Sequence, residues 1–234
     1  MNLLLNGCSF SDNYYLVQNL AKQLGYDQAI SLSKGGSSNR RIVRTTVEYL
    51  ETHDDIGFVL LGLTFLRRHE SALVDYKKDQ DRWIQYGSHG LQYHYLQETD
   101  TYKTHSLAQV EKFVQNLYDY DIDITYADQL ITDLIMLSGY LKERQINHLF
   151  FNFCEYRYKD YFDDVSPRYR KIAENNLHIV PLDQFNANLF LRDHGAKYAE
   201  PEARWPEYAR HYNGEEYIHL NNYFMRYLEN NKLL

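Results

Sequence analysis

Hydrophobic positions in this chain fall into short continuous runs that are separated by helical repeats. The first run, Leu3–Leu5, leads into a small turn that carries Ser9. After the turn, apolar residues recur at helical spacing as far as Leu24, and Gly25 is placed to end that helix. This pattern predicts a strand, a turn and a helix, with a hydroxyl group presented at the C-terminal edge of a sheet.

Further runs of the same kind predict the rest of the sheet. The other predicted strands are Ala29–Leu32, Phe58–Leu61, His148–Phe153 and His178–Leu182. Helical stripes follow at 42–50, capped by Ser37 or Ser38, at 130–137, and in a terminal helix that begins near His219. Strands and helices that alternate along a chain indicate a mostly parallel sheet with helices on both faces.

Two segments interrupt this alternation. Residues from about 67 to 123 have mixed charge, many tyrosines and no strong period, so we expect an insertion over the strand ends. Residues from about 192 to 215 contain two prolines and several charges, which favours a surface loop. A length of 234 residues suits one large domain, so we expect a single domain, 1–234, whose insertion forms a lid or cap.

Charge and cysteine content exclude several classes of protein. The net charge is -7 and the 25 basic residues are scattered, which disfavours nucleic-acid binding. Cys8 and Cys154 are too few for a disulfide framework, and neither has zinc-ligand spacing. The first residues lack the features of a signal peptide, and no apolar run approaches the roughly 20 residues of a membrane span. We therefore expect a cytoplasmic protein with reduced thiols, no membrane segment and no bound metal.

The two ends of the chain carry complementary catalytic groups. Ser9 lies near the first end, whereas Glu216 and His219 lie three residues apart near the other. A serine hydroxyl is a weak nucleophile unless a base removes its proton and an acid orients that base. If folding brings the ends together, this set predicts a hydrolytic site.

In their order along the chain, these residues resemble the SGNH, or GDSL-type, hydrolases, including a divergent branch encoded by phages. That family consists of esterases and lipases with a three-layer α/β/α, flavodoxin-like fold, here with five strands. The segment Gly7–Ser11 stands where the family has Gly-Asp-Ser, and 216–219 stands where it has Asp-x-x-His. The resemblance implies Ser9 as nucleophile, His219 as base and Glu216 as acid, with Glu215 as an alternative acid.

The resemblance also implies an oxyanion hole and a substrate. Its donors would be the amides of Ser9 and Gly36, with Gly35 as the alternative to Gly36, and a side chain at residue 64. The expected substrate is a small acyl ester or an acylated carbohydrate, hydrolysed through an acyl-enzyme without a cofactor. Arg67 and Arg68 follow the third strand and could bind an anionic group of that substrate.

The chain departs from the family at three positions. Cys8 replaces the aspartate before the nucleophile, and Glu216 is one methylene longer than aspartate. Thr64 stands where the family has an oxyanion-binding asparagine, and loss of one such donor can lower turnover by about 10²- to 10³-fold. Asn39 or Asn152 could supply the missing amide.

Three other interpretations remain open at this stage. Ser9 could only cap the helix that follows it, and His219 could be a surface residue at a helix start. The departures at 8, 64 and 216 also fit a non-catalytic binding or structural module, such as one encoded by a phage. A flavodoxin-like nucleotide binder is weaker, because Lys34–Ser38 lacks the spacing of a phosphate-binding loop. Oligomeric state is not predicted.

Overall fold

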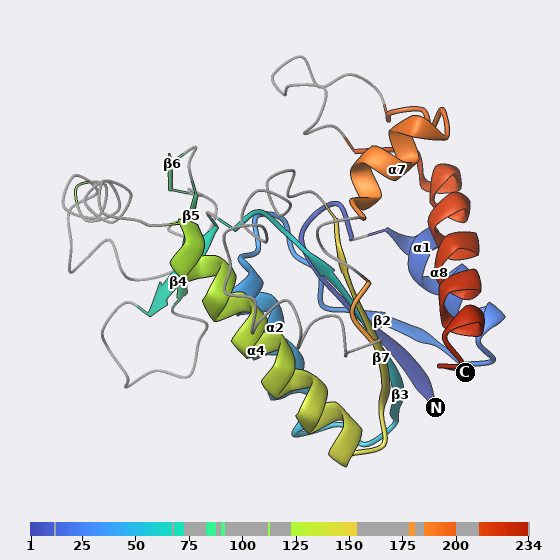
Figure 1. The fold of residues 1–234 in the computed structure, drawn as a ribbon, viewed down its shortest axis with the longest axis horizontal. Helices are drawn as coiled ribbons and strands as arrows, with labels where there is room; N and C mark the ends of the chain where they lie inside the picture. The colour runs from blue at the N-terminus through green and yellow to red at the C-terminus, as the bar shows by residue number, and fades with distance from the viewer. Residues whose placement is uncertain are drawn as a thin grey trace.

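The core of the protein is a parallel four-stranded sheet (Figure 1). The structure is a computed structural model that describes residues 1–11, 13–66, 68–72, 83–87, 90–91, 112, 123–153, 178–180, 185–199 and 211–233. The strands are β1 (Asn2–Asn6), β2 (Ala29–Ser31), β3 (Ile56–Leu63) and β7 (Asn147–Asn152). Their order across the sheet is β2-β1-β3-β7, with every neighbouring pair parallel.

Helices cover both faces of this sheet, which gives three layers (Figure 1). On one face lie α2 (Asn39–Leu50) and α4 (Asp123–Glu143), and on the other lie α1 (Tyr14–Gln23) and α8 (Ile218–Asn230). A short α7 (Ala187–Asp193) lies beside α8, and a 3-10 helix, η4 (Gly214–Tyr217), directly precedes α8. The α/β/α architecture predicted from the sequence is confirmed.

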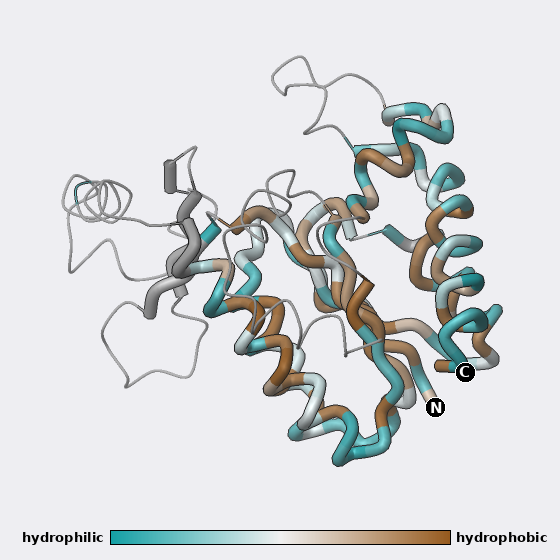
Figure 2. Tube along the Cα trace, in the orientation of Figure 1, coloured by the Kyte–Doolittle hydropathy of each residue, from teal (hydrophilic) through white to brown (hydrophobic). Residues whose placement is uncertain are grey.

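Burial explains why the central strands read as continuous apolar runs. All eight residues of β3 are buried, because helices cover this strand on both sides. Two hydrophobic clusters result. One contains Leu5 and residues of α1 and α8, and the other contains Leu4 and residues of α2 and α4. In Figure 2 the strands are mostly hydrophobic, and the helices carry hydrophobic residues on one side.

Two helix-end residues predicted from the sequence take the expected positions in the structure. Ser38 caps α2, because its side chain accepts a hydrogen bond from the Arg41 N–H at 3.1 Å. Gly25 follows α1 with a φ of +76°, a left-handed conformation that glycine adopts without steric cost. Within the described residues, no helix is long and apolar enough to span a membrane.

The fifth predicted strand is present only as a bridge in the described part of the chain. Ile179 pairs with Phe150 in parallel, and hydrogen bonds of 2.9 Å join the Phe150 N–H to the His178 carbonyl and the Val180 N–H to the Phe150 carbonyl. Residues 181–182 of that prediction lie outside the described residues. The bridge extends the sheet beyond β7, in the place expected for a fifth strand.

The predicted insertion contains strands that its lack of periodicity did not indicate. A small antiparallel sheet is formed by β4 (His69–Ala72), β5 (Trp83–Gly87) and β6 (Gly90–Leu91), and β4 lies against α2. The other residues of 67–123 lie outside the described residues, apart from 68, 112 and 123. The role of this region as a lid therefore stays a prediction.

Candidate active site

Asn6 anchors the turn that follows β1. Its buried Oδ1 accepts a hydrogen bond from the Gly7 N–H, and its Nδ2 donates one to the Ile42 carbonyl of α2, both at 2.9 Å. Cys8 is fully buried, whereas Ser9 is partly exposed. The turn therefore holds Ser9 at the C-terminal end of β1 with part of its surface open to solvent.

Ser9 does not cap the helix after the turn. Asn13 caps α1, since its Oδ1 accepts hydrogen bonds from the backbone N–H groups of Tyr15 and Leu16 at 2.9 and 3.4 Å. The interpretation of Ser9 as a helix cap is therefore wrong. Within the part of the chain that the structure describes, the Ser9 hydroxyl makes no hydrogen bond, either to His219 or to another group.

The glycine loop after β2 lies beside Ser9. A Cβ built on Gly35 would lie 3.8 Å from the Ser9 Cβ, which is ordinary van der Waals contact. Lys34 ties the loop to the first turn through a 3.2 Å hydrogen bond from its N–H to the Gly7 carbonyl. Gly36 has a φ of +75° and so needs the conformational freedom of glycine. Of the two glycines considered for the oxyanion hole, Gly35 is thus placed next to the candidate nucleophile, and Gly36 follows it in the same loop.

Thr64, the predicted third oxyanion donor, is fully buried at the end of β3. Its N–H donates to Oδ1 of Asn39 at 2.8 Å, and its carbonyl accepts from Nδ2 of Asn39 at 3.1 Å. Asn39, one candidate for the missing amide, therefore holds the end of β3 against the start of α2. Asn152, the other candidate, is buried at the end of β7 opposite Leu63.

Of the two predicted substrate-binding arginines, Arg67 lies outside the described residues. Arg68 is partly buried, and its Nη1 donates to Oγ1 of Thr64 at 2.9 Å. Its guanidinium carbon also lies 4.9 Å from the centre of the Phe65 ring. Arg68 is therefore directed back to the end of β3 by a hydrogen bond and a cation–π contact.

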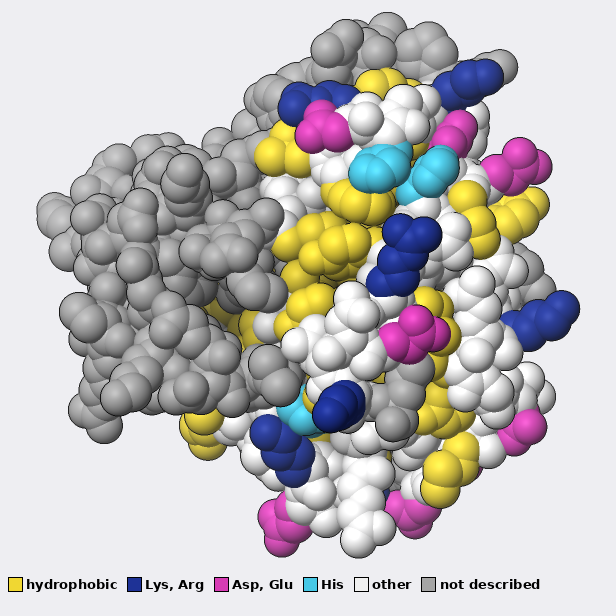
Figure 3. All heavy atoms as spheres, turned by 45° about the vertical axis from the view of Figure 1, so that its right-hand side comes forward, with side chains coloured by type: hydrophobic (Ala, Val, Ile, Leu, Met, Phe, Trp, Pro, Cys, Tyr) yellow, Lys and Arg dark blue, Asp and Glu magenta, His cyan; other side chains and the backbone are white. Residues whose placement is uncertain are grey.

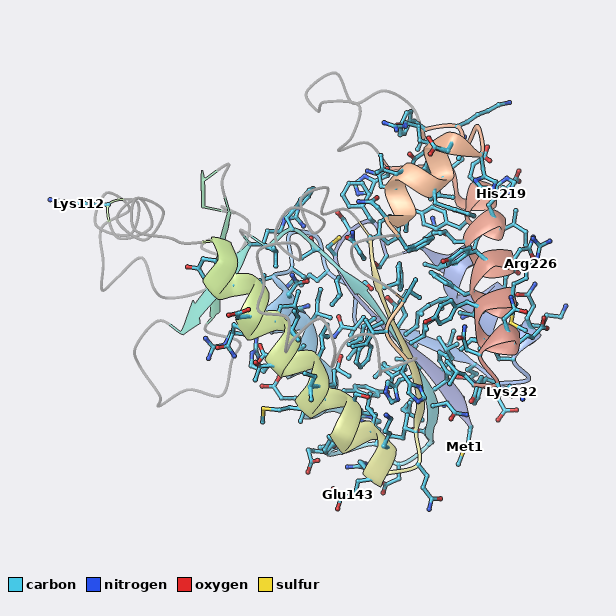
Figure 4. The ribbon with its side chains drawn as sticks, viewed as in Figure 1. Met1, Lys112, Glu143, His219, Arg226 and Lys232 are labelled. Atoms are coloured by element: carbon cyan, nitrogen blue, oxygen red, sulfur yellow. The ribbon has the colours of Figure 1, made fainter. Side chains whose placement is uncertain are left out.

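The predicted base and acid are neighbours at the start of α8. Nε2 of His219 lies 4.0 Å from Oε2 of Glu216, and the two side chains are 38% and 22% exposed. The distance is longer than a hydrogen bond. The His219 ring also faces His194, at 5.6 Å between ring centres. Figure 4 shows His219 at the upper end of α8, and Figure 3 shows neighbouring histidines at the surface above hydrophobic side chains.

Tyr217 joins the start of α8 to the first turn, a contact that the sequence analysis missed. Its buried hydroxyl donates a 2.9 Å hydrogen bond to the carbonyl of Phe10, the residue after Ser9. Burial raises the pKa of the Tyr217 hydroxyl far above its ordinary value, so this group remains a proton donor. A second bond, from Nδ2 of Asn221 to the Tyr15 carbonyl at 3.3 Å, joins α8 to α1.

Folding therefore brings most of the predicted site to one end of the sheet. Ser9 lies next to the glycine loop, and Tyr217 attaches the segment of Glu216 and His219 to the residue after Ser9. The catalytic roles of these side chains stay predictions. Within the described residues, no group of three or more His, Cys, Asp or Glu side chains is arranged to hold a metal ion.

The structure contains a second serine–histidine pair that the sequence did not suggest. Oγ of Ser138 on α4 lies 2.8 Å from Nε2 of His148 on β7, and both side chains are 1% exposed. Nδ1 of His148 lies 3.1 Å from the Ile146 carbonyl, which can only accept, so in the neutral ring Nε2 accepts from Ser138. A substrate has no access to a pair this deeply buried, so we interpret it as a link between α4 and the sheet.

Acidification is expected to destabilise the protein through this pair. Burial is the largest of the effects that lower the pKa of His148, from 6.5 to about 4. The unfolded chain therefore takes up a proton below about pH 6.5 that the folded chain excludes. Stability from this residue is full above that pH and falls by about 2 kcal/mol at pH 5 and about 3 kcal/mol at pH 4.

Urea unfolding at pH 7.5 and pH 5 measures this loss. His148→Gln keeps a polar side chain without a titrating ring and should show a smaller loss than the original chain. His53→Gln, which changes an exposed histidine, should leave the loss unchanged. If the free energy of unfolding falls equally on acidification in the original chain and in His148→Gln, His148 is not the cause of the loss.

Comparison with known proteins agrees with the fold. No protein-family model and no curated protein sequence matches the chain. Among solved structures, the chain is similar to TesA, with 12% identity, full coverage of both chains and a TM-score of 0.50. It is also similar to the psychrotrophic esterase EstA from Pseudoalteromonas sp., with 10% identity, coverage of 97% and 98%, and a TM-score of 0.49.

A protein from Desulfitobacterium hafniense assigned to the G-D-S-L lipolytic family is similar as well. The identity is 9%, coverage is 97% of this chain and 99% of that one, and the TM-score is 0.49. The likeness to TesA covers the whole of both chains. At these identities it defines the fold, and the chemistry has to be argued from the residues of this chain.

Proposed function

We propose that the protein is a serine esterase or deacylase that cleaves a small acyl ester or an acylated carbohydrate. The observation that supports this most is the placement of a partly exposed Ser9 beside the Gly35–Gly36 loop, at the end of the sheet to which Tyr217 attaches the start of α8. Backbone amides of such a loop can stabilise the negative charge that develops on an ester carbonyl oxygen. We further propose a cytoplasmic location.

In this mechanism His219 takes the Ser9 proton as Oγ attacks the ester carbonyl. The alkoxide leaves with that proton, and water then hydrolyses the acyl-enzyme by the reverse sequence. Glu216 would orient the ring and stabilise its cationic form. In the structure the ring nitrogen paired with Glu216 is Nε2. The His219 ring therefore has to turn before Nε2 can accept the Ser9 proton while Glu216 contacts Nδ1.

A second candidate is a non-catalytic binding or structural module, of the phage-encoded kind that the sequence resemblance suggested. The 4.0 Å separation of Glu216 from His219 and the pairing of Asn39 with the Thr64 backbone favour it. In this function the shared end of the sheet would bind a ligand without breaking a bond. Both candidates use the same fold, so a direct test of Ser9 reactivity separates them.

A fluorophosphonate probe tests the proposed esterase. We expect stoichiometric labelling, located at Ser9 by peptide mass spectrometry. Ser11 is an internal control in the same peptide, because its side chain is completely buried. Hydrolysis of short-chain aryl acetates should accompany labelling. If the folded protein is not labelled and does not hydrolyse these esters, the binding module is the better description.

A further inference from the structure

Arg68 carries a positive charge that is held in place by neutral groups among the described residues. Its described contacts are the hydrogen bond from Nη1 to Thr64 and the contact with the Phe65 ring. Within the described residues, no carboxylate forms an ion pair with it. A guanidinium has five N–H donors, and a neutral hydroxyl acceptor uses one of them and compensates none of its charge. The remaining donors suit a planar or tetrahedral anion.

Strand register places this cation close to the first turn. Asn6 of β1 pairs with Leu61 of β3, so the residues that follow these strands leave the sheet side by side. Ser11 packs against both Gly7 and Gly62, which shows that the two chain segments remain adjacent beyond the paired positions. Thr64, which accepts the hydrogen bond from Arg68, thus directly follows the strand next to the one that leads to Ser9.

A second series of contacts joins the same residues through α2. Asn39 at the start of α2 is hydrogen-bonded to the Thr64 backbone, and the loop that precedes α2 contains Gly35, where an added Cβ would lie 3.8 Å from the Ser9 Cβ. Arg68, Thr64, Asn39, Gly35 and Ser9 are therefore linked in series at one end of the sheet, with Thr64 and Asn39 buried beneath it. A substrate whose carbonyl lies at Ser9 would reach Arg68 by extending across this end of the sheet.

We infer that Arg68 binds an anionic oxygen group of the substrate, so that the site prefers small esters bearing a carboxylate or a phosphate. This inference rests on the proposed esterase function and adds a substrate class to it. The Thr64 hydroxyl and the Phe65 ring orient the guanidinium before binding, which reduces the entropy lost when an anion binds. Neutral esters cannot make this contact, so their binding depends on the acyl group alone.

Three aryl acetates with the same acetyl group test the preference. They are 4-acetoxybenzoate, 4-acetoxyphenyl phosphate and the neutral 4-acetoxybenzamide. In the original chain we expect kcat/KM to be higher for one or both anions than for the amide, and the better anion identifies the group preferred. Arg68→Gln should reduce that preference about tenfold or more, as expected for loss of a charge-assisted hydrogen bond.

The matched control is Arg44→Gln, which removes a positive charge from α2 where Arg44 pairs with Glu48 at 2.9 Å. It should leave the preference unchanged, because long-range attraction is screened at ordinary ionic strength. An equal loss of the preference for anions in both variants would mean that the overall charge of the protein causes it, and not a contact with Arg68. If Arg68→Gln lowers the rates for charged and neutral esters equally, or lowers neither, Arg68 does not recognise the anion.

A binding measurement separates this inference from the esterase proposal. A calorimetric titration of the folded protein with 4-hydroxybenzoate or phenyl phosphate measures anion binding and does not depend on ester hydrolysis. Arg68-dependent binding by a protein that hydrolyses no ester would retain anion recognition and reject the esterase. Ester hydrolysis without charge preference, together with no Arg68-dependent binding, would retain the esterase and reject the role of Arg68. If the protein shows neither ester hydrolysis nor Arg68-dependent binding, the esterase proposal and the role of Arg68 are both rejected.

Discussion

Ser9→Ala is expected to lower kcat/KM for short aryl esters by about 10³-fold or more, with the fold unchanged. The substitution removes the attacking oxygen, so no acyl-enzyme can form. The Ser9 side chain is partly exposed and makes no hydrogen bond among the described residues, so its loss leaves no buried group unsatisfied. Initial rates and thermal unfolding of both proteins provide the measurement.

His219→Ala should reduce activity to a similar extent, whereas His194→Ala provides a matched control. His194 is the neighbouring imidazole, 5.6 Å from His219 between ring centres, and lies at the end of α7. If the control costs as much activity as His219→Ala, His219 is not the specific base. Glu216→Gln should have a smaller effect, because the 4.0 Å contact shows that Glu216 does not hold the ring firmly.

Gly62→Ala is expected to lower the free energy of unfolding by about 1 to 3 kcal/mol. The cause is steric, because a Cβ on Gly62 would overlap Oγ of Ser11 and approach Cζ of Phe151 to 3.2 Å. Ser11 is fully buried, and its Oγ lacks a hydrogen-bond partner within the described structure. Urea unfolding of the variant measures the cost.

Ser11→Ala makes this prediction specific. Alone, it removes a buried hydroxyl without a partner, so stability should stay the same or rise by about 1 kcal/mol. Combined with Gly62→Ala, it removes the overlapping atom and should restore part of the lost stability. Ser11→Ala should not restore the stability lost in Gly7→Ala, because a Cβ on Gly7 would still lie 2.5 Å from the Ser11 Cβ. Equal rescue of both alanine variants would contradict this packing.

The sheet and its main helices were predictable because their signals are local. The buried run of β3 and the caps at Ser38 and Gly25 follow from burial on two faces and from backbone geometry at helix ends. The strands of the insertion and α7 were missed. The segment 69–91 has no clear alternation, and α7 has only seven residues, which is too short for helical periodicity to stand out.

Side-chain pairing at the site was less predictable than the backbone. Asn39 was a candidate oxyanion donor, and the structure shows a contact that was not predicted, in which its amide pairs with the Thr64 backbone. Tyr217 lies inside the predicted acid–base segment without having been singled out, although it ties α8 to Phe10. These partners are 25 and 207 residues apart in the chain. A single sequence carries no signal for contacts over such separations.

The order of polar and apolar residues by itself determined the layered parallel sheet and the turn that carries Ser9. Hydrophobic periodicity and end signals act within a few residues, so they can be read directly. Only the tertiary structure decided that Gly35 lies against Ser9, that Gly7 and Gly62 make room for Ser11, and that Arg68 is directed toward Thr64. Those contacts depend on how distant segments pack, and packing is a property of the whole fold.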